Sequence, residues 1–364
     1  MKIQAAVVRE KNGSFQLEQL ELDDPRDYEV LVKIVGVGIC HTDLTCRDQY
    51  YPAPLPAVFG HEGSGIVERV GAKVTKVCPG DHVVLSYRAC GHCSSCLGGD
   101  SPHCDEIFAY NFSGTRDDQS YSLNDGENPV HGNFFGQSSF ASFALAHESN
   151  TVKVTKDVPL ELLGPLGCGI QTGAGAVINT LAPKAGSSIA VFGCGAVGLA
   201  AIMAAKIVGC TKIIAVDLHQ SRLELARTLG ATDMFCPGEI DPVQAIHAIT
   251  GRGVDFSVEC TGLPGVFRQS VDALNVIGVC ALVGAAPLGT EASLDMNTIM
   301  FGRTIKGVIE GDAIPDIFIP KMIDLYTRGM FPFDKLVSYY SLNEINQAVS
   351  AMEQGKVIKA VLRP

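Results

Sequence analysis

Positive charge is scarce in this sequence relative to negative charge. Its 364 residues include 28 Lys and Arg against 39 Asp and Glu, and the formal net charge is −11. A protein that binds nucleic acid needs a basic surface, and no stretch of this sequence supplies a local basic patch. We therefore expect no nucleic-acid partner.

Long apolar runs are also scarce. The start, MKIQAAVVREKNGSF, has no apolar core behind a basic end, so it does not indicate a secretory signal. Residues 189–205, IAVFGCGAVGLAAIMAA, are uncharged and reach the lower length limit for a membrane span, but three glycines interrupt them. A buried strand that leads into a helix explains this run better, and we expect a cytoplasmic protein without a membrane segment.

Cysteine is abundant by contrast. The sequence has 13 cysteines, an odd number, and no export signal. Reduced or metal-bound thiols are therefore expected rather than a framework of disulfides.

The middle of the chain alternates apolar runs with helical patterns. The runs begin near residues 188, 212, 233, 254, 279 and 304, with helical patterns between most of them. Such alternation predicts an α/β unit with a doubly wound parallel sheet.

A glycine-rich turn lies at the start of this unit. GCGAVG places Gly193, Gly195 and Gly198 where a strand turns into a helix, and Asp217 ends the next strand. The pattern is typical of dinucleotide binding: the glycines allow a tight turn, approach to a pyrophosphate and close helix packing. Asp217 would bind the adenosine ribose hydroxyls and repel a 2′-phosphate, which favours NAD over NADP. The alternative is a surface Asp that caps the next helix.

The first 165 residues have a different pattern. Short alternating runs such as EVLVKIVGVGI, separated by Gly and Pro, indicate antiparallel β structure. The chain after about residue 305 returns to a helix and a closing strand, KVIKAVLRP. We expect a β-rich domain formed by residues 1–168 and 305–364, with a cofactor domain at 169–304 inserted into it.

Four cysteines are packed into one short segment. CGHCSSCLGGDSPHC supplies Cys90, Cys93, Cys96 and Cys104, which one loop can fold around a tetrahedral ion. Four thiolates leave no open coordination position, so the segment predicts a structural zinc site. An iron–sulfur cluster is the main alternative.

Three further candidate ligands are scattered. Cys40 in GICHTD and His61 in GHEGSG each follow an apolar strand, and Cys168 lies in GPLGCGIQTGAG. Two Cys and one His are a ligand set of catalytic zinc, which keeps its fourth position open. Each residue alone could instead be a buried thiol or a hydrogen-bonded histidine.

The motifs together resemble a known family. GICHTD, GHEGSGIVERVGAKV, PGDHV, the cysteine loop, LGCGIQTGAGAV and GCGAVG occur in the order found in the zinc-dependent medium-chain alcohol dehydrogenases. CHTDLTCRDQYYPAPLPAVFGHEGSG, NFSG, FGQSSFASFAL and FDKLVSYYSLNEINQA resemble the bacterial aryl-alcohol (benzyl alcohol) dehydrogenases in particular. The resemblance implies a β-rich, GroES-like catalytic domain and a Rossmann cofactor domain.

The resemblance also assigns roles to residues. It implies that Cys40, His61 and Cys168 are ligands of a catalytic zinc ion. It implies that the four clustered cysteines are ligands of a structural zinc ion. Asp43 would orient His61, Glu62 would be a transient ligand, Thr42 would take the substrate proton, and His41, Arg222 and Lys359 would contact the cofactor. The last three could instead be ordinary surface charges. Thr45 stands where many relatives have a histidine that completes the proton relay, so the exit of the proton is left open.

The function that follows from the resemblance is reversible NAD-dependent oxidation of primary aromatic or allylic alcohols. A zinc alkoxide would transfer hydride to the nicotinamide, and two zinc ions per subunit are expected. Tyr51, Phe112 and Phe140 are candidates for the substrate pocket, although aromatic residues are also common in cores. A homo-oligomer, dimer or tetramer, is expected. The alternatives are a zinc dehydrogenase for other alcohols and a non-catalytic protein that binds NAD and zinc.

Overall fold

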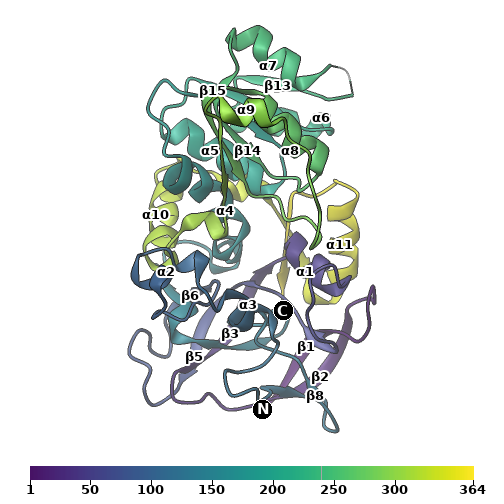
Figure 1. Ribbon diagram of the computed structural model, residues 1–364. Coiled ribbons are helices and arrows are strands. Elements are labelled where there is room, and N and C mark those ends of the chain that lie inside the picture. Colours follow the sequence, from purple (N-terminus) through teal and green to yellow (C-terminus); the bar gives the residue numbers. More distant parts are fainter. Residues whose placement is uncertain (239) are drawn as a thin grey trace. The chain divides into compact units, whose positions relative to one another are not determined.

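Two compact units make up the protein. The computed structural model describes residues 1–238 and 240–364. The first unit comprises Met1–Cys168, Ile314–Asp324 and Asp334–Pro364, and the second comprises Gly169–Ala313 and Leu325–Phe333 (Figure 1). The first segment of the first unit ends at Cys168, and the second unit continues to Ala313.

The first unit is built on two sheets that are mainly antiparallel. A five-stranded sheet has the order β4-β1-β2-β7-β8, and a seven-stranded sheet has the order β10-β6-β5-β3-β18-β17, with β9 also paired to β3. The strands are β1 (Lys2–Val8), β2 (Gln16–Leu22), β3 (Glu29–Gly38), β4 (Ala57–Val58), β5 (Glu62–Val70), β6 (His82–Leu85), β7 (Leu123–Asn124), β8 (Pro129–Val130), β9 (Phe143–His147), β10 (Thr151–Val154), β17 (Val337–Ser341) and β18 (Lys359–Arg363). The helices are α1 (His41–Arg47), α2 (Ser94–Leu97), α3 (Ile107–Phe112), α11 (Ile345–Glu353) and most of α10 (Pro315–Thr327).

Strand β3 organises this unit. Its sequence, EVLVKIVGVG, is rich in β-branched residues and almost wholly buried, as expected for a central strand. It pairs with β5 and β9, and near its end with β18, where Val361 faces Gly38. Because β3 stops at Gly38 and α1 begins at His41, the Cys40 side chain lies at a strand-to-helix junction next to the start of β5.

The second unit is a single parallel sheet with helices. The sheet has six strands in the order β13-β12-β11-β14-β15-β16, and all its pairs are parallel. Its strands are β11 (Ser188–Phe192), β12 (Lys212–Val216), β13 (Asp233–Phe235), β14 (Val254–Glu259), β15 (Leu274–Leu282) and β16 (Thr304–Gly307). Its helices are α4 (Gly169–Gly175), α5 (Ala196–Ile207), α6 (Gln220–Leu229), α7 (Pro242–Thr250), α8 (Pro264–Asp272) and α9 (Met296–Met300).

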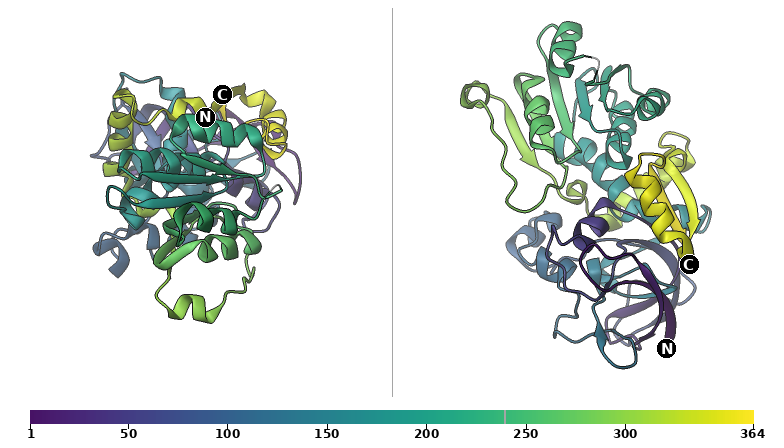
Figure 2. Two further views of the ribbon diagram at one scale, coloured as in Figure 1. Left: turned by 90° about the horizontal axis from the view of Figure 1, so that it is seen from above. Right: turned by 90° about the vertical axis from the view of Figure 1, so that its right-hand side faces the viewer.

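This strand order fixes where the helices lie. Right-handed crossovers that run outward from β11 on either side place α5 and α6 on one face of the sheet and α7 and α8 on the other. Accordingly, α5 contacts α6 and α7 contacts α8. Figure 2 shows the strands between helices when the molecule is seen from above. The doubly wound sheet predicted from the sequence is therefore confirmed.

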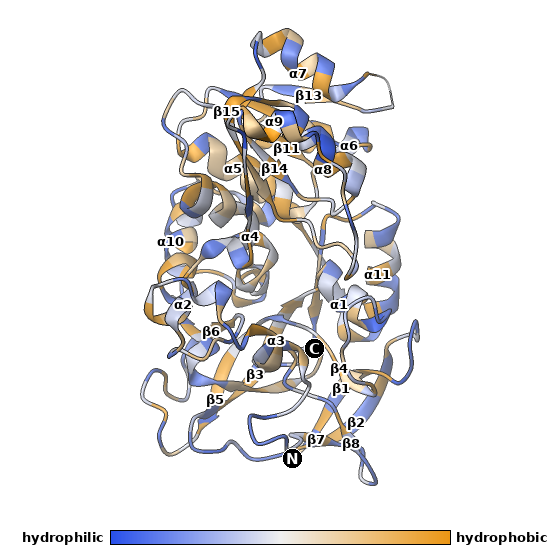
Figure 3. Cartoon of the chain, in the orientation of Figure 1, coloured by the Kyte–Doolittle hydropathy of each residue, from blue (hydrophilic) through white to orange (hydrophobic). Residues whose placement is uncertain are grey.

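The apolar run at 189–205 is divided between two elements of this unit. Its first residues form the buried strand β11, and the rest form α5, which is buried from Gly198 to Ala205. By contrast α8 buries only Ser270 and Val271 and presents a hydrophilic surface (Figure 3). Across the described part of the chain, no helix combines the length and the apolar character that a membrane crossing needs.

Candidate active site

Asp43 connects the elements that carry the first candidate ligands. It lies in the first turn of α1, is fully buried, and its Oδ2 accepts a hydrogen bond from the Cys40 backbone N–H at 2.9 Å. Its Oδ1 accepts from the Gly60 N–H at 3.0 Å and lies 2.8 Å from His61 Nδ1. One carboxylate thus holds the chain on both sides of the site and fixes the orientation of the imidazole.

The ligand atoms of four residues converge in the first unit. One ligand atom from each of Cys40, His61, Glu62 and Cys168 lies within 4.8 Å of all the others, and three of the four residues are buried. Among residues 1–238 and 240–364, His61 Nε2 is a buried nitrogen without a hydrogen-bond partner. A nitrogen held in this way, beside two thiols, fits a metal ion that accepts its lone pair.

The electrostatics of the site favour a thiolate. The hydrogen bond from Cys168 lowers the pKa of Cys40 well below its ordinary value, and the nearby His61 and Lys359 charges act in the same direction against burial. Burial alone would lower the pKa of His61, but the charges of Asp43 and Cys40 outweigh it and raise that pKa well above the ordinary value. Deprotonated sulfur is the form that binds a metal.

Lys359 is a buried, ion-paired side chain and not an ordinary surface charge. Its Nζ donates to both carboxylate oxygens of Glu62, at 2.8 and 2.9 Å, and to the Ile39 carbonyl at 3.0 Å. An ammonium has three N–H donors, so these acceptors use all of them. Burial raises the pKa of Glu62 despite the Lys359 charge. Each side chain therefore depends on the other to compensate its buried charge.

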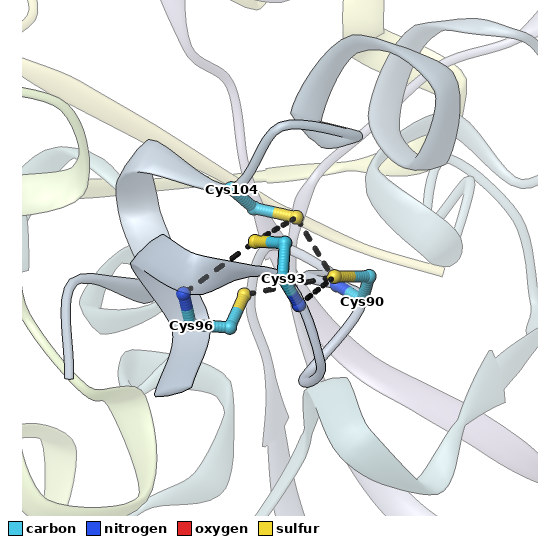
Figure 4. Close-up of side chains that lie close together, drawn as sticks. All are labelled: Cys90, Cys93, Cys96 and Cys104. Atoms are coloured by element: carbon cyan, nitrogen blue, oxygen red, sulfur yellow. Dashed lines mark hydrogen bonds between the residues drawn. The ribbon is translucent and has the colours of Figure 1, made fainter. Parts of the chain in front are cut away.

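The four clustered cysteines also come together in the first unit (Figure 4). The Sγ atoms of Cys90 and Cys96 are 3.8 Å apart, and those of Cys93 and Cys104 are 4.0 Å apart. A tetrahedral ion with Zn–S bonds of about 2.3 Å requires sulfur–sulfur distances of about 3.8 Å. A disulfide would bring two sulfurs to about 2.05 Å, and a cluster of several iron atoms would need them further apart. The geometry therefore fits one ion.

Backbone N–H groups surround these sulfurs. Cys93 N donates to Cys90 Sγ at 3.2 Å, Cys90 N to Cys104 Sγ at 3.3 Å, and Glu106 N to Cys104 Sγ at 3.4 Å. The N–H groups of Cys96 and Asp105 lower the pKa of Cys93 to about 6. Such donors stabilise negative charge on sulfur, as a metal site with four thiolates requires.

The glycine-rich turn of the second unit has the backbone that its sequence predicts. Gly193 has φ of +92°, a left-handed conformation. A Cβ at Gly198 would lie 1.8 Å from the Gly193 carbonyl oxygen, whereas a Cβ at Gly195 would meet nothing within 4 Å. Helix packing thus requires glycine at 198, and the backbone at 195 is open to approach.

Asp217 is tied directly to this turn. One carboxylate oxygen accepts from Cys194 N at 2.7 Å and the other from His219 N at 2.8 Å. Arg222 Nη1 lies 3.9 Å from the same carboxylate. The structure thus brings Asp217, Arg222 and the glycine-rich turn together in the second unit. His41, at the first position of α1, is exposed in the first unit.

Aromatic residues form a cluster beside His61. The rings of Tyr51 and Phe112 are 6.2 Å apart, and Phe112 is 5.2 Å from Phe135. Phe135 lies on the face of the His61 ring at 4.3 Å, and Phe134 meets its edge at 5.5 Å. Phe134 and Phe135 were not among the residues predicted from the sequence. The signal that could have found them is the FF pair at the start of FFGQSSF, which overlaps the motif FGQSSFASFAL.

Phe140 lies outside this cluster, and its surroundings fit the alternative of a core residue better than a wall of the substrate pocket. Its side chain is fully buried, and its ring packs edge-on against Phe15 at 5.6 Å. It also lies against Gly60, where an added Cβ would come within 2.5 Å of the Phe140 backbone nitrogen. Phe140 is therefore a core residue that packs against Gly60, next to His61.

Two hydroxyl groups of α1 have different surroundings. Thr42 Oγ1 lies 3.8 Å from Cys40 Sγ, beside the converging ligand atoms. Thr45 Oγ1 donates to the His41 carbonyl at 3.0 Å within the helix. Thr42 is therefore placed next to the site, and Thr45 is engaged with backbone.

Comparison with known proteins identifies the family. Residues 26–156 match the alcohol dehydrogenase GroES-like domain, and residues 196–328 match the zinc-binding dehydrogenase domain. Geraniol dehydrogenase of Castellaniella defragrans is 46% identical over 362 residues, which cover 99% of this chain and 97% of that protein. The chain belongs to the zinc-dependent alcohol dehydrogenase family.

Solved structures of other zinc-dependent alcohol dehydrogenases share the fold. The alcohol dehydrogenase zinc-binding domain protein from Burkholderia ambifaria is 54% identical, with a TM-score of 0.98, and the match covers 100% of this chain and 99% of that one. Benzyl alcohol dehydrogenase from Acinetobacter calcoaceticus is 52% identical, with a TM-score of 0.97 and the same coverage. The GroES-like domain and the Rossmann domain expected from the sequence are thus confirmed.

Proposed function

We propose that this alcohol dehydrogenase catalyses the reversible NAD-dependent oxidation of primary aromatic or allylic alcohols, of the benzyl alcohol type, to aldehydes. The observation that carries the proposal is the buried Nε2 of His61, oriented by Asp43 and close to the sulfurs of Cys40 and Cys168. Two thiolates and one imidazole leave a fourth position for an alcohol oxygen.

The residues fit two zinc ions with different tasks. Cys40, His61 and Cys168 would hold a catalytic ion, and the four cysteines of the 90–104 loop would hold a structural one. A zinc ion bound at the first site supplies Lewis-acid chemistry that lowers the pKa of an alcohol hydroxyl and permits hydride transfer to a nicotinamide. Glu62, paired with Lys359, lies close enough to serve as a transient ligand.

The other residues of the site bind, orient and move protons. Asp43 accepts from His61 Nδ1 and so leaves Nε2 as the coordinating nitrogen. The Thr42 hydroxyl, 3.8 Å from Cys40 Sγ, is the nearest candidate to receive the substrate proton. Thr45 is bonded to the His41 carbonyl, so the proton would leave through the cofactor ribose rather than through this side chain.

The cofactor preference rests on Asp217. Its carboxylate is fixed at the end of β12 by the N–H groups of Cys194 and His219, next to the glycine-rich turn. A fixed negative charge there binds ribose hydroxyls and repels a 2′-phosphate. His41 and Arg222 are proposed as further contacts to the cofactor.

The substrate class is supported by relatives and by the aromatic cluster. One relative is named geraniol dehydrogenase and one structural neighbour benzyl alcohol dehydrogenase. In this chain Tyr51, Phe112, Phe134 and Phe135 gather beside His61. Stacking on such rings stabilises a bound aromatic substrate by about 0.5–1.5 kcal/mol beyond the burial of its apolar surface, and an allylic substrate gains from that burial.

We also propose a cytoplasmic homo-oligomer, dimer or tetramer, that acts on small molecules. The support for self-association is an exposed apolar surface on the second unit, at Val276, Ile277, Met296, Met300 and Phe301.

A screen of alcohols with parallel zinc analysis tests the proposal. Purified protein should contain two zinc ions per chain and oxidise benzyl alcohol and geraniol with NAD at a kcat/KM about 100-fold or more above that of ethanol. Asp217→Ser should narrow the gap between NAD and NADP. A higher kcat/KM for ethanol or a polyol would reject the aryl-alcohol substrate, and NAD binding without turnover of any alcohol would leave a non-catalytic protein.

A further inference from the structure

The segment Asn133–Ser139 packs against His61. The chemistry proposed above does not explain the left-handed backbone conformation of this segment. Asn133, Phe135, Gly136 and Ser138 all have positive φ values, of 58°, 51°, 62° and 52°. Left-handed backbone is costly for a bulky residue such as Phe135, and it persists only where surrounding contacts enforce it. The question is therefore what this conformation positions.

Hydrogen bonds tie the segment to the His61 backbone. Gln137 Nε2 donates to the His61 carbonyl at 2.9 Å, and Gln137 Oε1 accepts from Gly63 N at 3.0 Å. Ser138 Oγ accepts from Phe134 N at 2.9 Å and donates to the Val58 carbonyl at 2.7 Å. The segment is thus fixed to the chain on either side of Glu62, and its strained turn cannot shift independently of His61.

The strained turn aims one ring at the imidazole. The Phe135 ring centroid lies 4.3 Å from that of His61, with the planes 26° apart, while Phe134 meets the same imidazole edge-on at 5.5 Å and 81°. Both partners of the stack are buried. The Asp43 hydrogen bond sets the direction of Nδ1, and the stack limits rotation of the ring about its Cβ–Cγ bond. Together they leave Nε2 one orientation.

We propose that Phe135 is a positioning residue that holds the imidazole plane of His61 and thereby slows the loss of the metal ion bound there. This inference rests on the proposed function in that it takes His61 as a zinc ligand. An imidazole that donates to a cation is electron-poor, and the electron-rich face of a phenyl ring stabilises it. Phe135 is 74 positions after His61 in the sequence. The strained backbone is what brings its ring against the face of the imidazole.

A chelator competition tests this role without relying on turnover. Zinc release from the purified protein would be followed with a colorimetric indicator for the wild type, Phe135→Leu, Phe135→Met and Phe135→Tyr. Loss of the ring should speed the release of one of two zinc ions by about 2- to 30-fold, as stacking and cation–π energies imply, while the Tyr variant keeps the wild-type rate. The zinc of the four-cysteine site should be released at an unchanged rate and serves as the internal control.

Phe140→Leu is the matched control. It removes the buried ring of the residue that directly follows the segment, and that ring packs on Phe15 rather than on His61. Equal acceleration in the Phe135 and Phe140 variants, or equal loss of both zinc ions, would reduce Phe135 to a core residue and overturn the inference. Met at position 135 keeps the side chain flexible and similar in size, so a Leu variant that fails to fold does not end the test.

The assignment of the site is checked separately. Cys168→Ala should contain one zinc ion, because the site at His61 loses a ligand. If this variant retains two zinc ions, the proposed metal site is wrong. If it contains one zinc ion but the Phe135 variants release zinc at the wild-type rate, the metal site stands and the positioning role is rejected. Replacement of the zinc ion at His61 by cobalt gives a second readout, because a changed orientation of the imidazole alters the visible absorption of the cobalt ion.

Discussion

Glu62 and Lys359 are buried charges that depend on each other. Their relative exposures are close to zero, and the Lys359 ammonium is bonded to both Glu62 oxygens and to one carbonyl. A buried pair adds little net stability, but removal of one partner leaves an uncompensated charge. The pair is therefore a point at which a single substitution has a large effect.

Lys359→Met should lower the free energy of unfolding by about 3–5 kcal/mol, because Glu62 would remain buried without its counter-charge. The double variant Glu62→Gln/Lys359→Met should recover most of this loss. Urea denaturation of zinc-loaded protein measures both. Equal stabilities of the Lys359→Met and double variants would mean that Glu62 is not the source of the cost.

At the scale of residues, the sequence was informative where residue types are chemically restricted. His61 follows Gly60, and Cys168 follows Gly167. These residue types next to glycine pointed to metal ligands, because few other roles combine them in such positions. Phenylalanine serves cores and pockets alike, so only tertiary contacts distinguish Phe140, which packs on Phe15, from Phe135, which packs on His61. The partner of Lys359 could not be deduced either, since Glu62 is 297 positions away.

At the scale of elements, the 90–104 loop depends on its cysteines for order. Its helix α2 spans only Ser94–Leu97, and no residue of that helix is buried. A segment with so little core cannot hold itself in place by hydrophobic burial, so the binding energy of a metal becomes folding energy. The other site is supported by the core of the first unit, through Asp43 and the strands β3 and β5.

The two proposed metal sites should therefore differ in their response to ligand loss. Cys104→Ser should remove one zinc ion and lower the thermal midpoint of unfolding, while Cys168→Ala should remove the other, abolish alcohol oxidation and leave a folded protein that binds NAD. Metal analysis, thermal unfolding and cofactor titration distinguish these outcomes. Unchanged zinc content in either variant would contradict the ligand assignment.

At the scale of the whole molecule, the second unit ends in an exposed edge. Strand β16 is the last strand of the six-stranded sheet, and within the described residues the sheet order shows no strand beyond it. Five large apolar residues are exposed near it in the chain or in space, among exposed polar ones: Val276, Ile277, Met296, Met300 and Phe301. Ile277 lies close to Gly302, so these parts adjoin, and Figure 2 shows α9 standing apart from the other helices of its unit. An open edge beside apolar surface favours pairing with a second copy.

We expect the protein to sediment as a multiple of its 38.5 kDa chain. Ile277→Glu combined with Met300→Glu should shift it to the monomer, because two charges would be buried in the contact of each copy. Ile317→Glu, at another exposed apolar position, is the control. Sedimentation velocity measures all three forms, and a monomeric wild type would exclude this interface.

Much of the overall fold followed from the sequence, and the remainder has a physical reason. The alternation of strands and helices after residue 188 predicted the parallel sheet, and the short runs before residue 165 predicted antiparallel structure. The strand order β13-β12-β11-β14-β15-β16 leaves no trace in local patterns, because each strand is apolar in the same way. The pairing of β18 with β3 is likewise a contact between segments with no local relation.

That pairing has a consequence for the order of events during synthesis. The Lys359 ammonium bonds the carbonyl of Ile39, the residue before Cys40, across 320 positions. At about 5–20 residues per second, the ribosome needs roughly 16–64 s to travel that distance. Until then β3 is paired with β5 and β9 but lacks β18, and Glu62 lacks its counter-charge. The nascent chain can therefore close the 90–104 loop long before Lys359 can complete the surroundings of Glu62 at the other site, and we expect the four-cysteine site to take up its ion first.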